Sequence, residues 1–127
     1  MATWNDVKGY LKGQYNLQEF PDGSGVKMVF EYDDGRSQLV FVTDANGSWV
    51  TVASAIGPQE KVDANKVLNS AWLSSAPGGI TSLGGLVLFQ CTLYTDAIQG
   101  PELTEAIRAV AIAADEIEKE LGLGDDW

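Results

Sequence analysis

The sequence predicts an α+β fold, in which helices cover an antiparallel sheet. Several short segments alternate apolar and polar residues at period two, and glycine-containing turns separate them. The last long segment instead repeats apolar residues at helical spacing. Because the chain has 127 residues, we expect one domain spanning residues 1–127. The predicted order is helix, three-strand antiparallel meander, helix, β-hairpin and helix.

The first predicted helix begins after Thr3, a residue type that caps helix N-termini by accepting backbone N–H groups. Asp6 lies three residues further on, which resembles a capping box with the shorter acid. The side chains that share an apolar face are Trp4, Val7 and Leu11. A glycine-rich loop at residues 21–25 separates this helix from the sheet.

Three strands are predicted next, at residues 26–32, 37–43 and 49–56. The turns that join them lie at residues 33–36 and 44–47, and both contain glycine. The second turn includes an Asn-Gly pair, which is the strongest short hairpin signal. Strands joined by such tight turns are expected to pair as an antiparallel meander.

A second helix is predicted from its N-cap Asp63 to about Ser74, before a Pro-Gly-Gly stretch. Its apolar face consists of Val67, Leu68, Ala71 and Trp72. A β-hairpin follows, with residues 80–83 and 86–94 joined by Gly84-Gly85. One face of the longer strand is wholly apolar, and we therefore expect burial of Val87, Phe89, Cys91 and Leu93.

The closing helix is predicted to start at Pro101, which suits the first helical position, and to end at Gly122. Its apolar stripe consists of Leu103, Ile107, Val110, Ala114, Ile117 and Leu121. The stripe is compatible with a coiled-coil seam or with packing on the sheet. It covers fewer than three heptads, and this favours packing on the sheet.

Composition excludes several classes of function. The chain has 18 acidic and 8 basic residues, a net charge of −10, which argues against binding to nucleic acid or to an anionic membrane. It has no histidine, the usual metal ligand and general base. A single cysteine and an N-terminus without a basic or apolar leader predict a cytoplasmic protein.

The sequence contains no convincing catalytic or cofactor site. Asp33-Asp34 lies in a predicted turn, where aspartates usually bind local backbone groups. Cys91 lies among apolar residues with no histidine to pair with it, so a small buried hydrophobe is its expected role. The glycine pairs lack the residues of a phosphate-binding loop. We therefore predict no enzyme, no metal and no cofactor.

Tryptophans and acids are the candidates for binding. Trp49 and Trp72 are compatible with core packing or with a protein interface, where tryptophan is enriched. The net charge is −3 over residues 1–62 and −7 over residues 63–127. The C-terminal half of the closing helix carries four acids, Asp115, Glu116, Glu118 and Glu120. We interpret them as a solvated face or as a surface for a basic partner.

The element order and two segments resemble a known family. Residues 84–94 look like its long last strand, and residues 104–117 look like its closing helix. The family is the type III secretion chaperone-like fold, which includes the YbjN-type putative sensory-transduction regulators. The resemblance implies a non-enzymatic, acidic, homodimeric module that holds an extended segment of a protein client. By position, it places the dimer interface at Val67, Leu68, Ala71, Trp72, Ile80 and Leu83.

Two other functions remain as alternatives. A sheet covered by helices can enclose an apolar pocket, so a small-molecule-binding sensor domain is the main alternative. An enzyme that uses carboxylates would require two acids from distant segments to meet in a cleft, and no cluster in the sequence indicates this.

Overall fold

A computed structural model describes residues 1–76 and 78–123, and its elements confirm the predicted α+β class. The helices are α1 (Trp4–Gln14), α2 (Ala64–Leu68), α3 (Ala71–Ser75) and α4 (Gly100–Leu121). The strands are β1 (Gln18–Glu19), β2 (Gly25–Glu31), β3 (Ser37–Ala45), β4 (Trp49–Pro58), β5 (Gly79–Leu83) and β6 (Leu86–Tyr94). Short 3-10 turns lie at Gln59–Lys61 and Thr95–Ala97.

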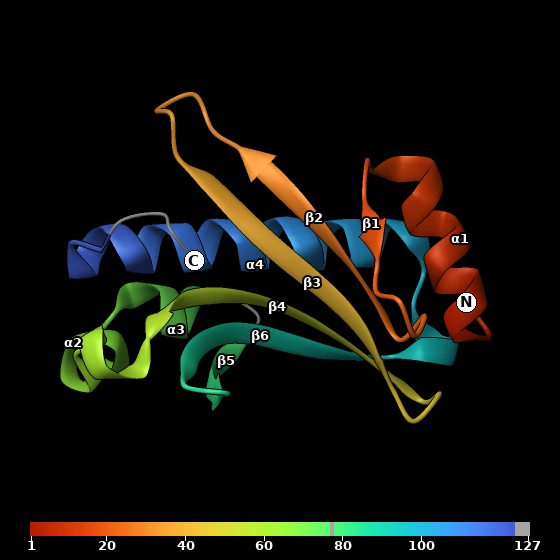
Figure 1. The fold of residues 1–127 in the computed structure, drawn as a ribbon. Coiled ribbons are helices and arrows are strands. Elements are labelled where there is room, and N and C mark those ends of the chain that lie inside the picture. Colours follow the sequence, from red (N-terminus) through yellow and green to blue (C-terminus); the bar gives the residue numbers. More distant parts are fainter. Residues whose placement is uncertain (77, 124–127) are drawn as a thin grey trace.

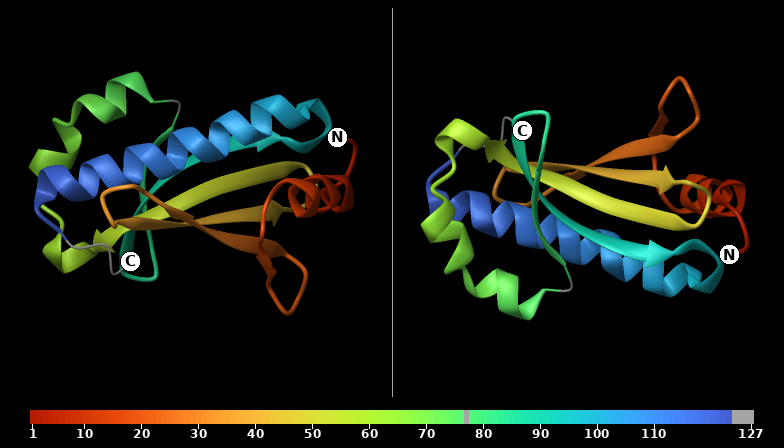
Figure 2. Two further views of the ribbon diagram at one scale, coloured as in Figure 1. Left: turned by 90° about the horizontal axis from the view of Figure 1, so that it is seen from above. Right: turned by 90° about the horizontal axis from the view of Figure 1, so that it is seen from below.

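The six strands form one antiparallel sheet in the order β1-β2-β3-β4-β6-β5. The long helix α4 crosses one face of this sheet, and α2 and α3 lie beside it (Figures 1 and 2). None of the described helices covers the opposite face (Figure 2). The tip of the β5–β6 hairpin bends toward that helix-free face, which makes the sheet strongly curved.

The main core lies between the sheet and α4. Alternating residues of β2, β3, β4 and β6 point into it, as their period-two patterns predict. Of the predicted helix stripe, Leu121 is partly buried and the other five residues are buried. Ala111, Ala113 and Ala114 are at most 1% exposed, so α4 approaches the sheet through small side chains.

The helix ends follow the predicted capping chemistry. The Thr3 hydroxyl accepts the Asp6 N–H at 3.2 Å, and the Asp6 carboxylate accepts the Thr3 N–H at 3.1 Å. Gly122 ends α4 with φ at 71°, a left-handed conformation that glycine adopts without strain. None of the described helices has both the length and the apolar character required to cross a membrane.

The structure corrects two sequence predictions. The helix predicted over residues 63–74 is two short helices, because Asn69 and Ser70 bind backbone groups at the break. Asn69 donates to the Asn65 carbonyl at 2.7 Å, and the Ser70 hydroxyl accepts the Trp72 N–H at 3.2 Å. The strand β1 was not predicted, and its two residues pair with Val26 and Lys27.

The close approach of α4 to the sheet is testable by overpacking. We expect Ala114→Leu to lower the free energy of unfolding by about 1–3 kcal/mol, because Ala114 is fully buried and its neighbours must move. Ala109→Leu, on a partly exposed position of the same helix, should change it by less than about 0.5 kcal/mol. Urea denaturation measures both variants, and equal effects would contradict the packing described.

Candidate functional site

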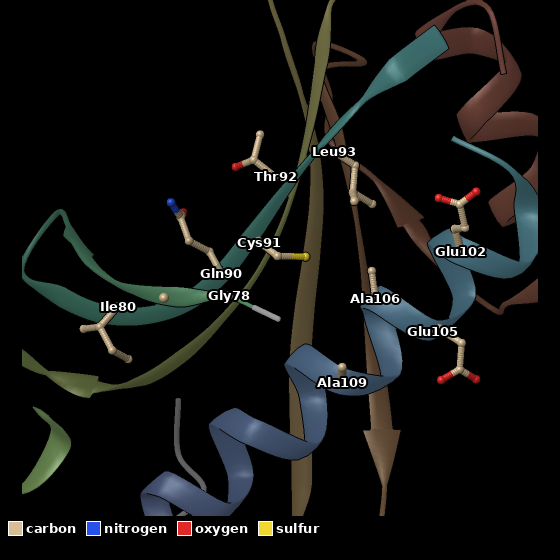
Figure 3. Close-up of a pocket in the computed structure, with 11 residues that line it drawn as sticks. Gly78, Ile80, Gln90, Cys91, Thr92, Leu93, Glu102, Glu105, Ala106 and Ala109 are labelled. Atoms are coloured by element: carbon tan, nitrogen blue, oxygen red, sulfur yellow. The ribbon is translucent and has the colours of Figure 1, made fainter. Parts of the chain in front are cut away.

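An open groove of about 840 Å³ runs between β6 and α4. Gly78, Gly79 and Ile80 bound one end of it, where the chain enters β5. Figure 3 shows Cys91 and Leu93 directed from β6 toward α4, with Ala106 and Ala109 facing them from the helix. Because both helix residues are alanines, they leave the space between strand and helix unfilled.

The groove follows a free strand edge. β5 pairs with β6 only as far as Gln90, whereas β4 pairs with β6 as far as Tyr94. The Thr95 N–H donates to the Ser48 carbonyl at 2.9 Å, and hydrogen bonding alternates along antiparallel strands. Thr92 and Tyr94 therefore direct their N–H and C=O groups away from β4, to an edge with which no described strand pairs.

Local packing keeps the end of the groove narrow at Gly78. A Cβ atom there would lie 2.5 Å from the Gln90 carbonyl oxygen and 2.8 Å from the Phe89 ring. Such contacts are shorter than van der Waals distance, so glycine is the residue that allows the chain to pass β6 this closely.

The groove has an acidic rim and an unreactive thiol. Glu102 and Glu105, in the first turns of α4, line its helix side. Arg108 lies 3.5 Å from Glu105, and no described cation forms an ion pair with Glu102. Burial raises the pKa of the Cys91 thiol, so the neutral thiol prevails near neutral pH, as expected for a small hydrophobe.

The sequence did not predict this groove, and of the residues that line it only Ile80 belongs to the predicted interface set. The last residues of β6 were expected to lie within a hairpin. One signal was present: the predicted hairpin had arms of unequal length, at residues 80–83 and 86–94. The excess length of the second strand leaves its last residues without a partner on one side.

The predicted interface residues do not share one exposed surface. Val67 is 2% exposed and belongs to the core, so its side chain cannot reach a partner. Leu68 and Leu83 are 69% and 72% exposed, but they lie on α2 and at the tip of the β5–β6 hairpin. Ala71 is exposed, whereas Trp72 and Ile80 are partly buried against the core.

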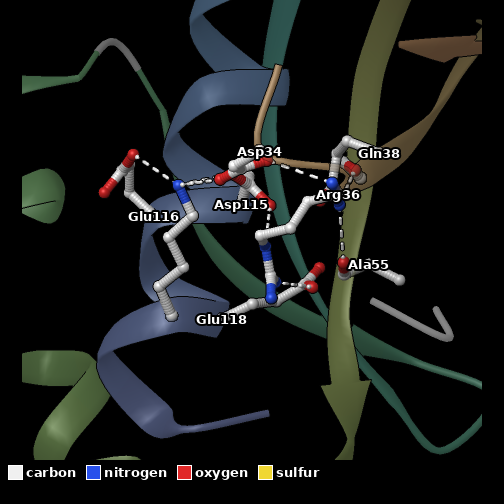
Figure 4. Close-up of polar contacts among 9 residues, drawn as sticks. Asp34, Arg36, Gln38, Ala55, Asp115, Glu116 and Glu118 are labelled. Carbon is white, nitrogen blue, oxygen red and sulfur yellow. Dashed lines mark hydrogen bonds and ion pairs between the residues drawn. The ribbon is translucent and has the colours of Figure 1, made fainter. Parts of the chain in front are cut away.

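The predicted acidic surface also requires correction. Asp115 and Glu118 are only 3% and 0% exposed, and both bind Arg36 from the turn between β2 and β3 (Figure 4). The Arg36 guanidinium donates to Asp115 at 2.8 Å and to Glu118 at 3.0 Å. Charge-assisted bonds to the partly buried Arg36 compensate for the loss of water around these carboxylates. Glu116 and Glu120 are the members of the set that reach the surface.

A second cation extends this cluster to the surface. Lys119 lies 3.0 Å from Asp34, 3.3 Å from Asp115 and 3.4 Å from Glu116. These carboxylates, Asp34 first, raise the pKa of Lys119. The Arg36 N–H and then Lys119 lower the pKa of Asp34. Burial, and secondarily the charge of Asp115, raises the pKa of Tyr32 to about 12. The cluster ties the β2–β3 turn to the C-terminal half of α4.

The metal, pocket and tryptophan expectations have different outcomes in the described residues. Within residues 1–76 and 78–123, no group of three or more His, Cys, Asp or Glu side chains is placed to hold a metal ion. Core side chains fill most of the space between the sheet and α4, where an apolar ligand pocket was the alternative, and the groove between β6 and the first half of α4 is open to the surface. Trp49 stacks on Tyr94 at 4.1 Å between ring centroids and is 38% exposed, outside the core.

Two solved structures share this fold. A chain of the HopA1-SchA chaperone-effector complex has a TM-score of 0.63 and 13% identity, with 87% of this chain and 88% of that chain covered. An uncharacterized protein from Methanothermobacter thermautotrophicus has a TM-score of 0.59 and 14% identity, with 93% and 95% covered. No family model and no curated protein matches the sequence. The likeness confirms the predicted chaperone-like fold, and no family model confirms the resemblance to YbjN-type proteins.

The buried ion pairs can be tested by removing their cation. We expect Arg36→Met to lower the free energy of unfolding by about 3–5 kcal/mol, because it removes the cation that pairs with buried Glu118 and leaves buried Asp115 with Lys119 alone. Arg108→Met removes an exposed pair with Glu105 and should change it by less than about 1 kcal/mol. Urea denaturation compares the two variants, and a small effect of Arg36→Met would contradict this assignment.

The lowered pKa of Asp34 predicts how the stability of the fold changes in acid. Because its folded-state pKa is lower than the ordinary value of 3.8, its stabilising contribution is present above that value and is lost as pH falls below it. Asp34→Asn should therefore lose less stability than the unaltered chain between about pH 5 and pH 2. Thermal unfolding across that range measures it. Asp33→Asn, in the same turn and without a described ion pair, should behave like the unaltered chain.

Proposed function

We propose that this chain is a non-enzymatic protein-binding module that holds an extended segment of a partner polypeptide along the free edge of β6. The observation that carries the proposal is the coincidence of an unpaired strand edge with the groove beside α4. An extended peptide adds to such an edge through main-chain hydrogen bonds, and alternate side chains then enter the neighbouring groove.

The geometry defines the segment that would fit. The free edge covers Cys91–Tyr94, about 13 Å at roughly 3.3 Å per residue, so a segment of about four to six residues spans it. Thr92 and Tyr94 would exchange backbone hydrogen bonds with it. Its inward side chains would meet Cys91 and Ala109, which favours small or medium apolar residues.

The rim favours a basic residue in the segment. Glu102 has no described ion pair and stands beside the groove, so a lysine or arginine there would gain a charge-assisted hydrogen bond. An acidic segment would be repelled by the same side chain and by the net charge of −10. The partner we expect is therefore extended, apolar on alternate positions and basic.

The structural comparison supports the class of function. One of the chains with this fold belongs to a complex described as chaperone and effector, which is an association between proteins. We extend that class, and not the identity of any partner, to this chain. We keep a cytoplasmic location as part of the proposal, because the single cysteine and the acidic composition fit a reducing compartment.

A labelled hexapeptide provides the test: its three alternate, groove-facing positions carry valine, valine and lysine, with serine between them (the valine–lysine peptide), and the same peptide with glutamate in place of lysine (the valine–glutamate peptide) is its charge control. We expect the first to bind and the second not to bind. Ala109→Leu should weaken binding at least about tenfold, because the added side chain fills the groove. Fluorescence anisotropy gives the dissociation constants, and Ala64→Leu, exposed on α2, is the matched control.

Hydrogen exchange locates the bound segment. The amides of Thr92 and Tyr94 should become protected when the peptide binds, because they form the new ladder. Glu102→Lys should weaken the valine–lysine peptide and strengthen the valine–glutamate peptide. Protection confined to other strands, or equal binding to Ala109→Leu and Ala64→Leu, would refute the proposal.

A further inference from the structure

The helix-free face of the sheet carries no charge on its three central strands. Register places partner residues of neighbouring strands on one face. On this face β3, β4 and β6 present Leu39, Phe41, Thr43, Trp49, Thr51, Ala53, Leu88, Gln90, Thr92 and Tyr94. The charged positions of the face, Lys27 and Glu31, lie on β2 toward its margin. In a chain with 20% charged residues, this is a large neutral surface.

The neutral face has a hollow at one end and a protrusion at the other. A groove of about 320 Å³ lies over Ala53, with Phe20 and Phe41 on one side and Leu83 and Leu86 of the bent hairpin on the other. The protrusion is the stacked pair of Trp49 and Tyr94, which are 38% and 57% exposed. A cross-strand row of Thr43, Thr51 and Thr92 separates the two.

We infer that this face is a self-association surface, on which a second copy of the chain packs about a two-fold axis. Sheets pack face to face at about 10 Å. The two-fold axis would lie between the two facing sheets, parallel to the threonine row. Rotation about this axis makes the strands of the second copy run in the opposite direction to those of the first. It brings Trp49 of one copy opposite Ala53 of the other, because each lies two residues from Thr51. The aromatic pair of each copy then enters the hollow of the other, as an isologous contact requires.

The hollow and the stacked aromatic pair favour a second copy as the occupant, and the absence of charge on this face permits the contact. Two chains that each carry a net charge of −10 repel one another wherever acidic surfaces meet. The neutral face allows contact without placing carboxylates opposite carboxylates or removing charged groups from water. A basic partner would gain more from the acidic rim near Glu102, which lies beside the other face of the sheet.

The small footprint of this face indicates a weak and reversible contact. β3, β4 and β6 have nine, ten and nine residues, so they span roughly 14 by 31 Å at about 3.4 Å per residue and 4.8 Å per strand. This footprint is roughly 430 Å² on each copy, about half the size of a standard interface, and Ala53, Ala55 and Leu88 within it are at most 9% exposed. We therefore expect a reversible dimer with a dissociation constant in the micromolar range.

This surface differs from the interface that the family resemblance implied. It shares Leu83 with that set and excludes the residues of α2 and α3. The peptide groove opens between β6 and α4 on the other side of the sheet. Thr92 and Tyr94 belong to both sites, but their side chains lie on the neutral face, whereas their backbone groups point to the peptide edge. A failure of self-association would leave peptide binding unaffected, and the converse also holds.

Sedimentation equilibrium from about 1 to 200 µM tests the inference. We expect the unaltered chain to dimerise. Thr51→Glu and Thr51→Lys should each be monomeric, because each places like charges opposite one another at the two-fold axis. An equal mixture of the two should dimerise again, since opposite charges then meet. Circular dichroism establishes that each variant is folded.

Two further variants distinguish this face from α2. Trp49→Ala should raise the dissociation constant at least about tenfold, because it removes the protrusion. Leu68→Glu adds the same charge as Thr51→Glu on a 69% exposed position of α2, and it should leave the dimer intact. A monomer at every concentration overturns the inference. The inference is also overturned if Leu68→Glu dissociates the dimer and Thr51→Glu does not. It is overturned likewise if the mixture of Thr51→Glu and Thr51→Lys remains monomeric.

Discussion

The contact between α4 and one face of the sheet is the constraint on which the rest of the structure depends. Both ends of this helix are tied to distant segments. Near its start, the Tyr10 hydroxyl lies 2.9 Å from that of Thr104, and a Cβ on Gly100 would lie 2.6 Å from the Tyr10 ring. Near its end, Arg36 binds Asp115 and Glu118. The 22-residue α4 covers only one face, and no helix in the described part of the chain covers the other.

Most of this fold follows from local patterns in the sequence. Period-two alternation and turn glycines predicted the meander, and the six-residue stripe predicted the face of α4 that packs on the sheet. Local patterns failed where a weak signal competed with tertiary contacts. Gln18 and Glu19 have no strand character of their own and are ordered by pairing with β2. Asn69 and Ser70 lie within an apolar helical period, yet their side chains end one helix and cap the next.

The candidate site was less predictable, because it depends on residues that are distant in sequence. The helical period places Glu118 four residues after Ala114 and three before Leu121, at the margin of the apolar stripe. Its partner Arg36 lies 82 residues earlier, and no local rule connects the two. The groove beside α4 likewise requires β6 to extend past β5 next to two alanines of a later helix. Only the unequal hairpin arms indicated it in advance.

The distribution of charge gives the two proposed surfaces opposite electrostatic requirements. Burial of Asp115 and Glu118 around Arg36 removes two acids from the surface, so the exposed acids of α4 are concentrated at its ends and outer side. At the rim of the groove, Glu102 attracts a basic segment of a partner, and added salt screens this attraction. The neutral face is governed instead by repulsion between whole molecules of net charge −10, which added salt reduces. Rising ionic strength therefore weakens the first association and strengthens the second, so the two are physically separable within one chain.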